Sequence, residues 1–263
     1  MNARTLGWAT KTIATIVLLF LAVPILIIVP LAFNSANYLR FPPEGLSFRW
    51  FDAVLSDTNW LDSAWISFQV AIGSTVLSVA LSLLAAIALV RGRLPVKQAI
   101  YALILLPMIV PNIIAAIAMF FFFSEVPQVP SVLAIVIGHT VLAVPIATII
   151  LSSTLQGIDT RLENAALSLG ASRVTAFRRI TLPLITPGMA SAFVFAFLSS
   201  FDELLIAMFM AATTAQTLPV RIWNSVLFQL DPTIAAVSVI LIIVSVACLL
   251  LVNLVAGRSK HGA

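Results

Sequence analysis

The chain has 263 residues, of which 61% are hydrophobic and 9% charged, and its formal net charge is +4. A water-soluble domain of this length is about one quarter charged, so this composition leaves too little polar surface to cover a globule. The composition therefore argues against an ordinary soluble enzyme and favours a membrane protein.

Long uncharged stretches divide the chain into candidate membrane spans. Six gaps between charged residues enclose 22 to 33 residues each, and a spanning helix needs about 20 apolar residues in a row. These runs lack the alternating apolar and polar pattern of barrel strands. The sequence predicts an all-α membrane protein with six transmembrane helices, over residues 12–33, 63–90, 98–123, 131–155, 187–212 and 233–256.

Basic residues fall mostly on one predicted side of this membrane. If both termini lie on the same side, the segments on that side hold eleven Lys and Arg residues, against Arg40, Arg49 and Arg221 on the other. Because Lys and Arg accumulate in cytoplasmic loops, both termini are predicted to be cytoplasmic. The net charge thus follows from topology and gives no indication of nucleic-acid binding.

The longest predicted cytoplasmic segment, about residues 156–186, carries two short helical patterns, and we call it the two-helix loop. Apolar residues recur at three- and four-residue intervals up to Gly170, a suitable residue to end a helix. Ser172 can cap a second helix, until Pro183 and Pro187 end the pattern. The apolar faces and arginines of this loop suit docking into a protein groove, and they equally suit an interfacial helix resting on anionic lipid.

A sequence motif in the two-helix loop resembles that of the permease subunits of bacterial ABC importers. These carry a Glu-Ala-Ala motif followed by a glycine and, further on, Leu-Pro; the matching residues are Ala165, Ala166, Gly170, Ala171, Leu182 and Pro183. The motif glutamate falls on Asn164, while Glu163 is one position early, so the sequence departs from the family there. In the family the loop docks on an ATPase subunit. The resemblance implies that these eight residues couple the chain to an ATPase.

Two acidic residues, Asp202 and Glu203, lie inside the fifth predicted helix. If that helix starts near Pro187, its rise places Asp202 roughly 22 Å up, in the outer half of the membrane core. One such charge costs about 2.5 to 3.5 kcal/mol at the centre of a membrane helix. One interpretation is that the acids line a substrate path. The other is that neighbours such as Ser199, Ser200 or Arg221 satisfy them and they hold the bundle together.

The segments that follow the acidic pair narrow the resemblance. The sequences QTLPVRIW at 216–223 and LDPTIAA at 230–236 look most like the polyamine-type permeases. That group includes permeases for putrescine and spermidine, and relatives thought to carry opines or aminophosphonates. A desolvated carboxylate is a suitable counter-charge for an amine, so the resemblance and the electrostatics point to the same class of substrate.

The resemblance covers nearly the whole chain, which we interpret as one permease domain of residues 1–263. It implies the translocation subunit of an ATP-driven importer in a bacterial inner membrane. The implied partners are a second permease subunit, two copies of an ABC ATPase, a periplasmic substrate-binding protein and membrane lipid. No glycine-rich phosphate loop followed by Lys and Ser/Thr occurs. We therefore expect ATP and Mg²⁺ on the ATPase subunits and no cofactor in this chain.

Two other classes of function remain open from the residues alone. A secondary transporter would use Asp202 or Glu203 as a proton carrier, and uptake driven by a proton gradient without ATP would favour it. An intramembrane enzyme would need a nucleophile and a base in register, and the sequence offers none. His139 lacks an acidic partner within a helical turn, which favours a packed or hydrogen-bonded histidine over a proton relay. His139, His261 and Cys248 do not form a plausible metal site.

Prolines inside the apolar runs mark possible helix kinks. They are Pro24, Pro30, Pro107, Pro111 and Pro145. A kink along a substrate path and an ordinary tolerated kink are both consistent with the sequence.

Overall fold

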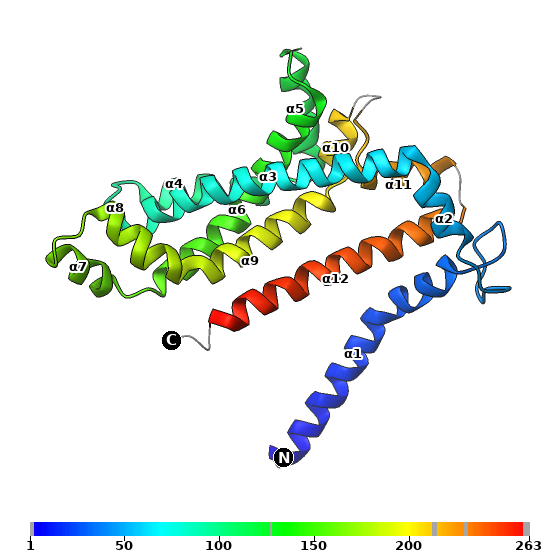
Figure 1. The fold of residues 1–263 in the computed structure, drawn as a ribbon, viewed down its shortest axis with the longest axis horizontal. Helices are drawn as coiled ribbons and strands as arrows, with labels where there is room; N and C mark the ends of the chain where they lie inside the picture. Colours follow the sequence, from blue (N-terminus) through cyan, green and yellow to red (C-terminus); the bar gives the residue numbers. More distant parts are fainter. Residues whose placement is uncertain (1–2, 127, 212–214, 229–230, 260–263) are drawn as a thin grey trace. The chain divides into compact units, whose positions relative to one another are not determined.

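The computed structural model describes residues 3–126, 128–211, 215–228 and 231–259, with the backbone alone for 3–7, 9, 248, 249 and 251–259. Over these residues every regular element is helical, and one isolated bridge joins Asn34 to Leu46. The chain forms two compact units, residues 1–61 with 222–244 and residues 62–221 with 245–263 (Figure 1). The predicted all-α class is confirmed.

Long apolar helices account for most of the described chain. Four are long and apolar enough to cross a membrane, namely α1 (Ala3–Ala32), α3 (Thr58–Arg91), α6 (Ser131–Gln156) and the continuous helical run Arg173–Phe201. A bent pair of helices supplies a possible fifth span. The last helix, α12 (Thr233–Ser259), contains an apolar stretch over Thr233–Ala247 within the described part of the chain. A sixth span at this helix stays a prediction.

The prediction of one continuous third helix is wrong. The run consists of α4 (Lys97–Leu105), a 3₁₀ turn (Leu106–Met108) and α5 (Asn112–Ser124). The two parts meet at an angle of 95°. Pro107 lies in the turn and Pro111 directly precedes α5, and neither can donate a backbone hydrogen bond to a continuing helix. The prolines therefore end one helix and start another.

The predicted start of the fifth helix at Pro187 is also wrong. Three segments follow one another without a break, α8 (Arg173–Ala176), a π-helical turn (Phe177–Thr181) and α9 (Leu182–Phe201). In a regular helix the ring of Pro183 would clash with the carbonyl of residue 179, which here lies in the wider π-helical turn. The helix therefore passes through both prolines that were expected to end it.

The other end of the predicted fifth helix is interrupted. α9 stops at Phe201, and the short α10 (Leu205–Met210) begins after three residues, so Asp202 and Glu203 lie in a break and not inside a helix. Four residues named from the sequence, Ala212, Leu230, His261 and Cys248 by its side chain, lie outside the described residues.

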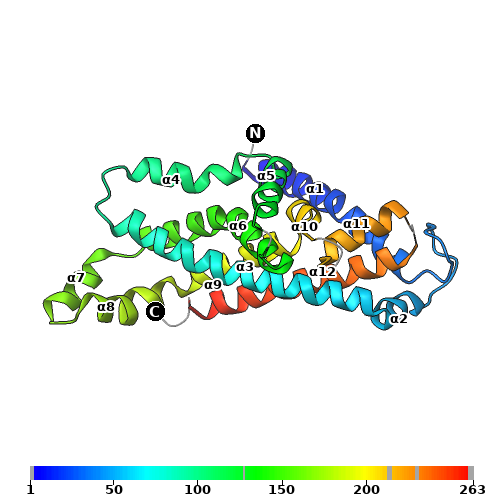
Figure 2. The same cartoon turned by 90° about the horizontal axis from the view of Figure 1, so that it is seen from above.

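Small residues bring the central helices of the second unit close together. α6 packs along α9, and their shared cluster with α3 contains Ala143, Ala147, Ala192 and Ala196. Gly188 of α9 marks the closest approach, since a Cβ added there would lie 2.2 Å from Oγ1 of Thr154. Such small-residue contacts are typical of membrane helix pairs. Figure 2 shows α6 and α9 side by side.

A second cluster holds α5, α6 and α10 together. It includes Ala116, Ile135, Ile206 and Met210, all buried. The short α10 therefore packs on α6 at the level where α9 ends. This packing holds the break between α9 and α10 against α6.

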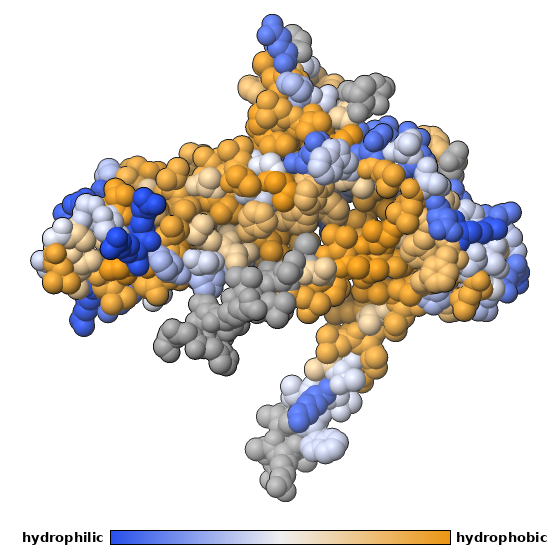
Figure 3. All heavy atoms as spheres, in the orientation of Figure 1, coloured by the Kyte–Doolittle hydropathy of each residue, from blue (hydrophilic) through white to orange (hydrophobic). Residues whose placement is uncertain are grey.

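Hydrophobic side chains also cover much of the outer surface of α3 and α9, whereas hydrophilic ones gather over the two-helix loop (Figure 3). Leu77, Leu84 and Phe195 are among the exposed apolar residues. Exposed apolar surface on long helices is what lipid or a partner helix would cover.

In the first unit, the loop between α1 and α2 (Arg49–Ser56) folds around the buried Asn34. Its Oδ1 accepts hydrogen bonds from the backbone N–H of Ala36 at 3.1 Å and of Glu44 at 3.2 Å, and its Nδ2 donates to the Tyr38 carbonyl at 3.2 Å. Nε1 of Trp50 donates to the Asn34 carbonyl at 2.8 Å. One asparagine thus organises the loop into an ordered structure.

Candidate functional site

The two-helix loop has the local structure that its sequence predicts. Asp159 caps the start of α7 (Thr160–Ser168), since its side chain accepts a hydrogen bond from the backbone N–H of Arg161. Gly170 has a φ of +87°, and the N–H of Ala171 donates to the Ala166 carbonyl at 3.0 Å, which closes the helix end. The Ser172 side chain accepts from the backbone N–H of Thr175 and caps α8. Two capped helices joined at a left-handed glycine make a defined projection.

Several motif residues of this projection face away from its own chain. Asn164, Ala165, Gly170 and Pro183 are exposed, while Ala166, Ala171 and Leu182 are partly buried. Apolar neighbours are exposed as well, with Leu162 at 48%, Val174 at 66% and Leu169 at 89% of their full surface. The loop therefore presents an apolar surface that the described part of the chain does not cover.

Glu163 differs from the other motif residues because it turns toward its own chain. Its Oε1 accepts a hydrogen bond from Oγ1 of Thr181 at 2.8 Å and lies 3.4 Å from a guanidinium nitrogen of Arg91. The same nitrogen donates to the Ile158 carbonyl at 3.0 Å. Arg91 is the last residue of α3, and Thr181 is the last residue of the π-helical turn. One carboxylate thus joins three separate segments.

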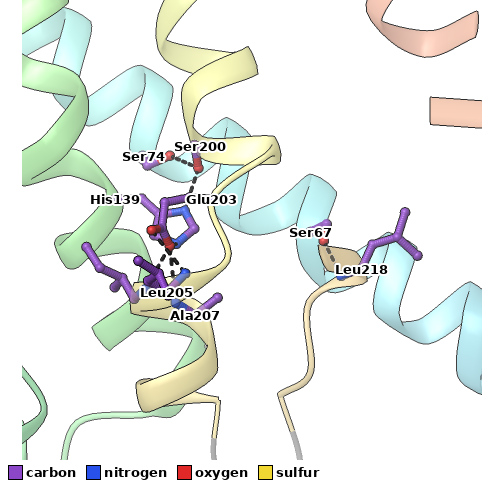
Figure 4. Close-up of polar contacts among 9 residues, drawn as sticks. Ser67, Ser74, His139, Ser200, Glu203, Leu205, Ala207 and Leu218 are labelled. Carbon is purple, nitrogen blue, oxygen red and sulfur yellow. Dashed lines mark hydrogen bonds and ion pairs between the residues drawn. The ribbon is translucent and has the colours of Figure 1, made fainter. Parts of the chain in front are cut away.

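The acidic pair at the end of α9 is divided between two environments. Glu203 is 8% exposed, and its carboxylate accepts hydrogen bonds from the backbone N–H groups of Leu205, Ile206 and Ala207 at 3.1, 2.8 and 3.4 Å (Figure 4). These are donors of the first turn of α10, which have no carbonyl partner within their own helix. Asp202, in contrast, is exposed.

His139 joins Glu203 to a buried polar cluster. Its Nε2 lies 3.4 Å from Oε2 of Glu203, and its Nδ1 lies 2.8 Å from Oγ of Ser200, which accepts a hydrogen bond from Ser74 at 2.8 Å (Figure 4). The prediction of a hydrogen-bonded histidine is confirmed. The prediction that it lacks an acidic partner holds only within α6, because the carboxylate comes from the break after α9.

This cluster places a serine, a histidine and a carboxylate in register, which the sequence did not indicate. Ser200 and His139 are only 4% and 1% exposed, and the serine hydroxyl is engaged by Ser74. A hydrolytic nucleophile must reach its substrate, and this one is enclosed by three helices. These hydrogen bonds therefore hold α3, α6 and the end of α9 together.

A pocket of about 390 Å³ opens where the two helix breaks meet, and we call it the break pocket. Its lining comprises Pro107, Met108, Asn112, Leu142, Ser199, Asp202, Glu203, Leu204 and Leu205. Among the described residues, no donor is bonded to the Asp202 carboxylate. The carbonyl end of α9 points to the same place and adds negative partial charge. The break pocket is therefore electrostatically suited to a cation.

Comparison with known proteins decides the family. Residues 78–261 match the binding-protein-dependent transport system inner membrane component family. The chain belongs to this family. The spermidine/putrescine transport system permease protein PotC of Haemophilus influenzae is 30% identical over 246 residues, which cover 94% of this chain and 95% of PotC. The putrescine transport system permease protein PotI of Escherichia coli strain K12 is 30% identical over 230 residues, covering 85% of this chain and 82% of PotI.

A solved structure supports the same fold. A chain of the bacterial alginate ABC transporter, in complex with an alginate pentasaccharide-bound periplasmic protein, superimposes with a TM-score of 0.71. The match covers 97% of this chain and 95% of that one, at 17% sequence identity. This likeness supports the fold alone. The family match shows that the chain is a permease subunit of an ABC importer, as its motif predicted, and its relatives are transport proteins and not enzymes.

Proposed function

We propose that this permease subunit carries a small cationic amine, such as putrescine or spermidine, through the membrane. The observation that supports this substrate is the exposed Asp202 carboxylate in the break pocket, which no donor of the described chain engages. An unpaired carboxylate within a membrane protein is costly, and an ammonium group would supply the missing charge during passage.

Asp202 and Glu203 have different roles in this proposal. Glu203 already receives three backbone N–H groups and lies beside His139, so its negative charge is compensated inside the protein. Asp202 instead caps the carbonyl end of α9, and in transporters the carbonyl ends of broken helices coordinate cations. Asp202 therefore meets the amine, and Glu203 holds the break in shape.

The relatives support an amine but do not by themselves decide it. PotC and PotI are named for spermidine and putrescine, whereas the structural neighbour acts on alginate, an acidic polysaccharide. One permease fold thus serves substrates of opposite charge. The charge of the substrate must be read from the pocket, and here the pocket is acidic.

Energy and delivery come from other subunits in this proposal. A second permease subunit completes the path, and a periplasmic binding protein delivers the substrate. Two ABC ATPase copies bind ATP and Mg²⁺ and dock on the exposed apolar surface of the two-helix loops. Exposed Leu169 and Val174 next to Gly170 support the docking surface. A groove in the ATPase would bury them at about 25 cal/mol per Å² of apolar area.

The neutral variant Asp202→Asn tests the role of the carboxylate, because it keeps shape and hydrogen bonding and removes only charge. In complexes reconstituted with ATPase and binding protein, we expect uptake of labelled putrescine to fall about tenfold, the loss of one charge-assisted contact. Glu125→Gln is the matched control, since Glu125 is exposed and lies outside the break pocket. Uptake at the wild-type rate in Asp202→Asn refutes the role.

Two further measurements separate the alternatives. Thermal shifts of the binding protein against polyamines, opines and aminophosphonates identify the substrate among amine-bearing solutes. Uptake that follows a proton gradient without ATP would instead indicate a secondary transporter.

The proposed orientation places both termini in the cytoplasm, so residue 46 lies outside and residue 169 inside. Both side chains are well exposed, at 84% for Leu46 and 89% for Leu169, and neither replaces a glycine with a constrained backbone. Single cysteines there, in a Cys248→Ala background, are labelled on intact cells with an impermeant maleimide. We expect labelling at position 46 alone, and labelling at 169 would reverse the topology.

A further inference from the structure

The carboxylate of Glu163 is the meeting point of three segments that are distant in sequence. It receives the Thr181 hydroxyl at 2.8 Å and lies 3.4 Å from the guanidinium of Arg91. Arg91 in turn donates to the carbonyl of Ile158, in the turn that leads into α7. The end of α3, the start of α7 and the end of the π-helical turn are thereby tied together.

The direction of Glu163 separates it from its neighbour. Successive residues of a helix point about 100° apart. Asn164, where the family motif has its glutamate, is exposed, while the Glu163 side chain is 25% exposed and bonded inward. Position 164 is therefore open to a partner, whereas position 163 serves the permease itself.

We propose that Glu163, Arg91 and Thr181 form an internal latch that makes α7 and α9 move as one body. The inference rests on the proposed docking of an ATPase on the two-helix loop. In it Glu163 is a positioning residue, which transmits the displacement of α7 and makes no contact with ATPase or substrate.

The need for a latch follows from the π-helical turn. The run Arg173–Phe201 is one helix, so a push at its start can reach Asp202 at its far end. The turn at Phe177–Thr181 interrupts the regular hydrogen-bond ladder, and such turns are weak points of a helix. Because Glu163 bonds to Thr181, the last residue of the turn, the latch carries the displacement of α7 past this weak point and directly into α9.

Two substitutions remove different halves of the latch. Glu163→Gln keeps an acceptor for Thr181 and removes the charge that Arg91 faces. Thr181→Val removes the hydroxyl donor at nearly constant shape, at a position that is 3% exposed. Arg93→Gln is the matched control, because it removes an exposed charge two residues from Arg91, outside the two-helix loop, without touching Glu163.

The measurement is the number of ATP molecules hydrolysed per substrate molecule imported, in the full complex with binding protein. We expect both latch variants to retain ATPase subunits at wild-type stoichiometry and to raise this ratio. The increase should be about tenfold for Thr181→Val, which loses a charge-assisted hydrogen bond, and smaller for Glu163→Gln, which loses only the ion pair to Arg91. The control should keep the wild-type ratio. Loss of the ATPase from Glu163→Gln would show that Glu163 contacts the partner, and an unchanged ratio in both variants would show that nothing is transmitted; either result overturns the latch.

A cross-linking rescue covers the case in which a latch variant assembles poorly. The pair Glu163→Cys and Thr181→Cys, in a Cys248→Ala background, breaks the latch, and a short bismaleimide then restores a covalent link between the same two positions. We expect the ATP-to-substrate ratio to return to within about twofold of wild type after cross-linking. A ratio that stays high, or uptake that stops, overturns the inference. A wild-type complex without co-purifying ATPase would instead refute the proposed function, and the latch with it.

Discussion

α9 is held at each end by one glutamate, and the two glutamates sit in opposite surroundings. At the start of α9, Glu163 contacts the side chains of Thr181 and Arg91, and its own side chain is 25% exposed. At the far end, Glu203 accepts three backbone N–H groups beside His139, and its side chain is 7% exposed. The first set of contacts is made by side chains, of which Glu163 and Arg91 are partly exposed and Thr181 is buried, and the second by buried backbone.

This difference predicts which end of α9 is held more strongly. Buried backbone donors that lose their acceptor keep the full desolvation penalty, so the bonds of Glu203 are expensive to open. An ion pair near water exchanges its partners for solvent at little cost. The contacts of Glu203 at the break after α9 are therefore expected to be stronger than those of the latch, although both sets persist while α7 and α9 move together.

The largest effect is expected from Glu203→Ala. The change leaves the first-turn donors of α10 without an acceptor, and each buried unsatisfied group costs about 1 to 3 kcal/mol. Together with the lost contact to His139, we expect a decrease of at least about 3 kcal/mol in the free energy of unfolding. Thermal unfolding of the purified subunit in detergent measures it.

Glu203→Gln is the control for this substitution, because its amide oxygen still accepts from the backbone. It should unfold between wild type and Glu203→Ala. If Glu203→Ala is as stable as wild type, the break is maintained by the packing of α10 on α6 and not by the carboxylate.

A smaller effect is expected from Gly188→Ala, between the two ends of α9. The added Cβ would lie 2.2 Å from Oγ1 and 2.7 Å from Cβ of Thr154, so α6 and α9 must separate. Overpacking of this kind costs about 1 to 3 kcal/mol. Thr154→Ala in the same chain removes Oγ1 and Cγ2 but keeps the Cβ at 2.7 Å, so it should recover part of the loss. If Gly188→Ala alone is as stable as wild type, the contact between the two helices is looser than the geometry indicates.

Signals that act over a few residues were readable from the sequence. Gly170 and Ser172 shape the two-helix loop through their own backbone and side-chain bonds, which involve residues three or four positions away. The small residues at which α6 and α9 pack also lie within predicted apolar spans. The all-α fold, the loop and the family could therefore be predicted before any tertiary contact was known.

The breaks could not be predicted in the same way, because they depend on neighbours far along the chain. The break at 202–204 contains neither proline nor glycine, and its cause is the Glu203 carboxylate that caps α10 against the buried His139. Proline alone does not identify a break either. Among these prolines, helices continue through Pro24, Pro30, Pro145 and Pro187. By contrast, α4 ends before Pro107 and α5 begins after Pro111. The break pocket arises from two interruptions that only the folded chain brings together.

The smallest effect on stability is expected from Glu163→Gln, at the exposed end of α9. The amide can still accept from Thr181, and the ion pair to Arg91 is partly screened by water, so the loss should not exceed about 1 kcal/mol. The same thermal unfolding assay measures it beside Glu203→Gln, which removes the same charge from the buried end. If Glu163→Gln destabilises the subunit as much as Glu203→Ala does, both ends of α9 are equally fixed. The latch contacts would then cost as much to lose as the buried contacts of Glu203, and the difference in their surroundings would not determine stability.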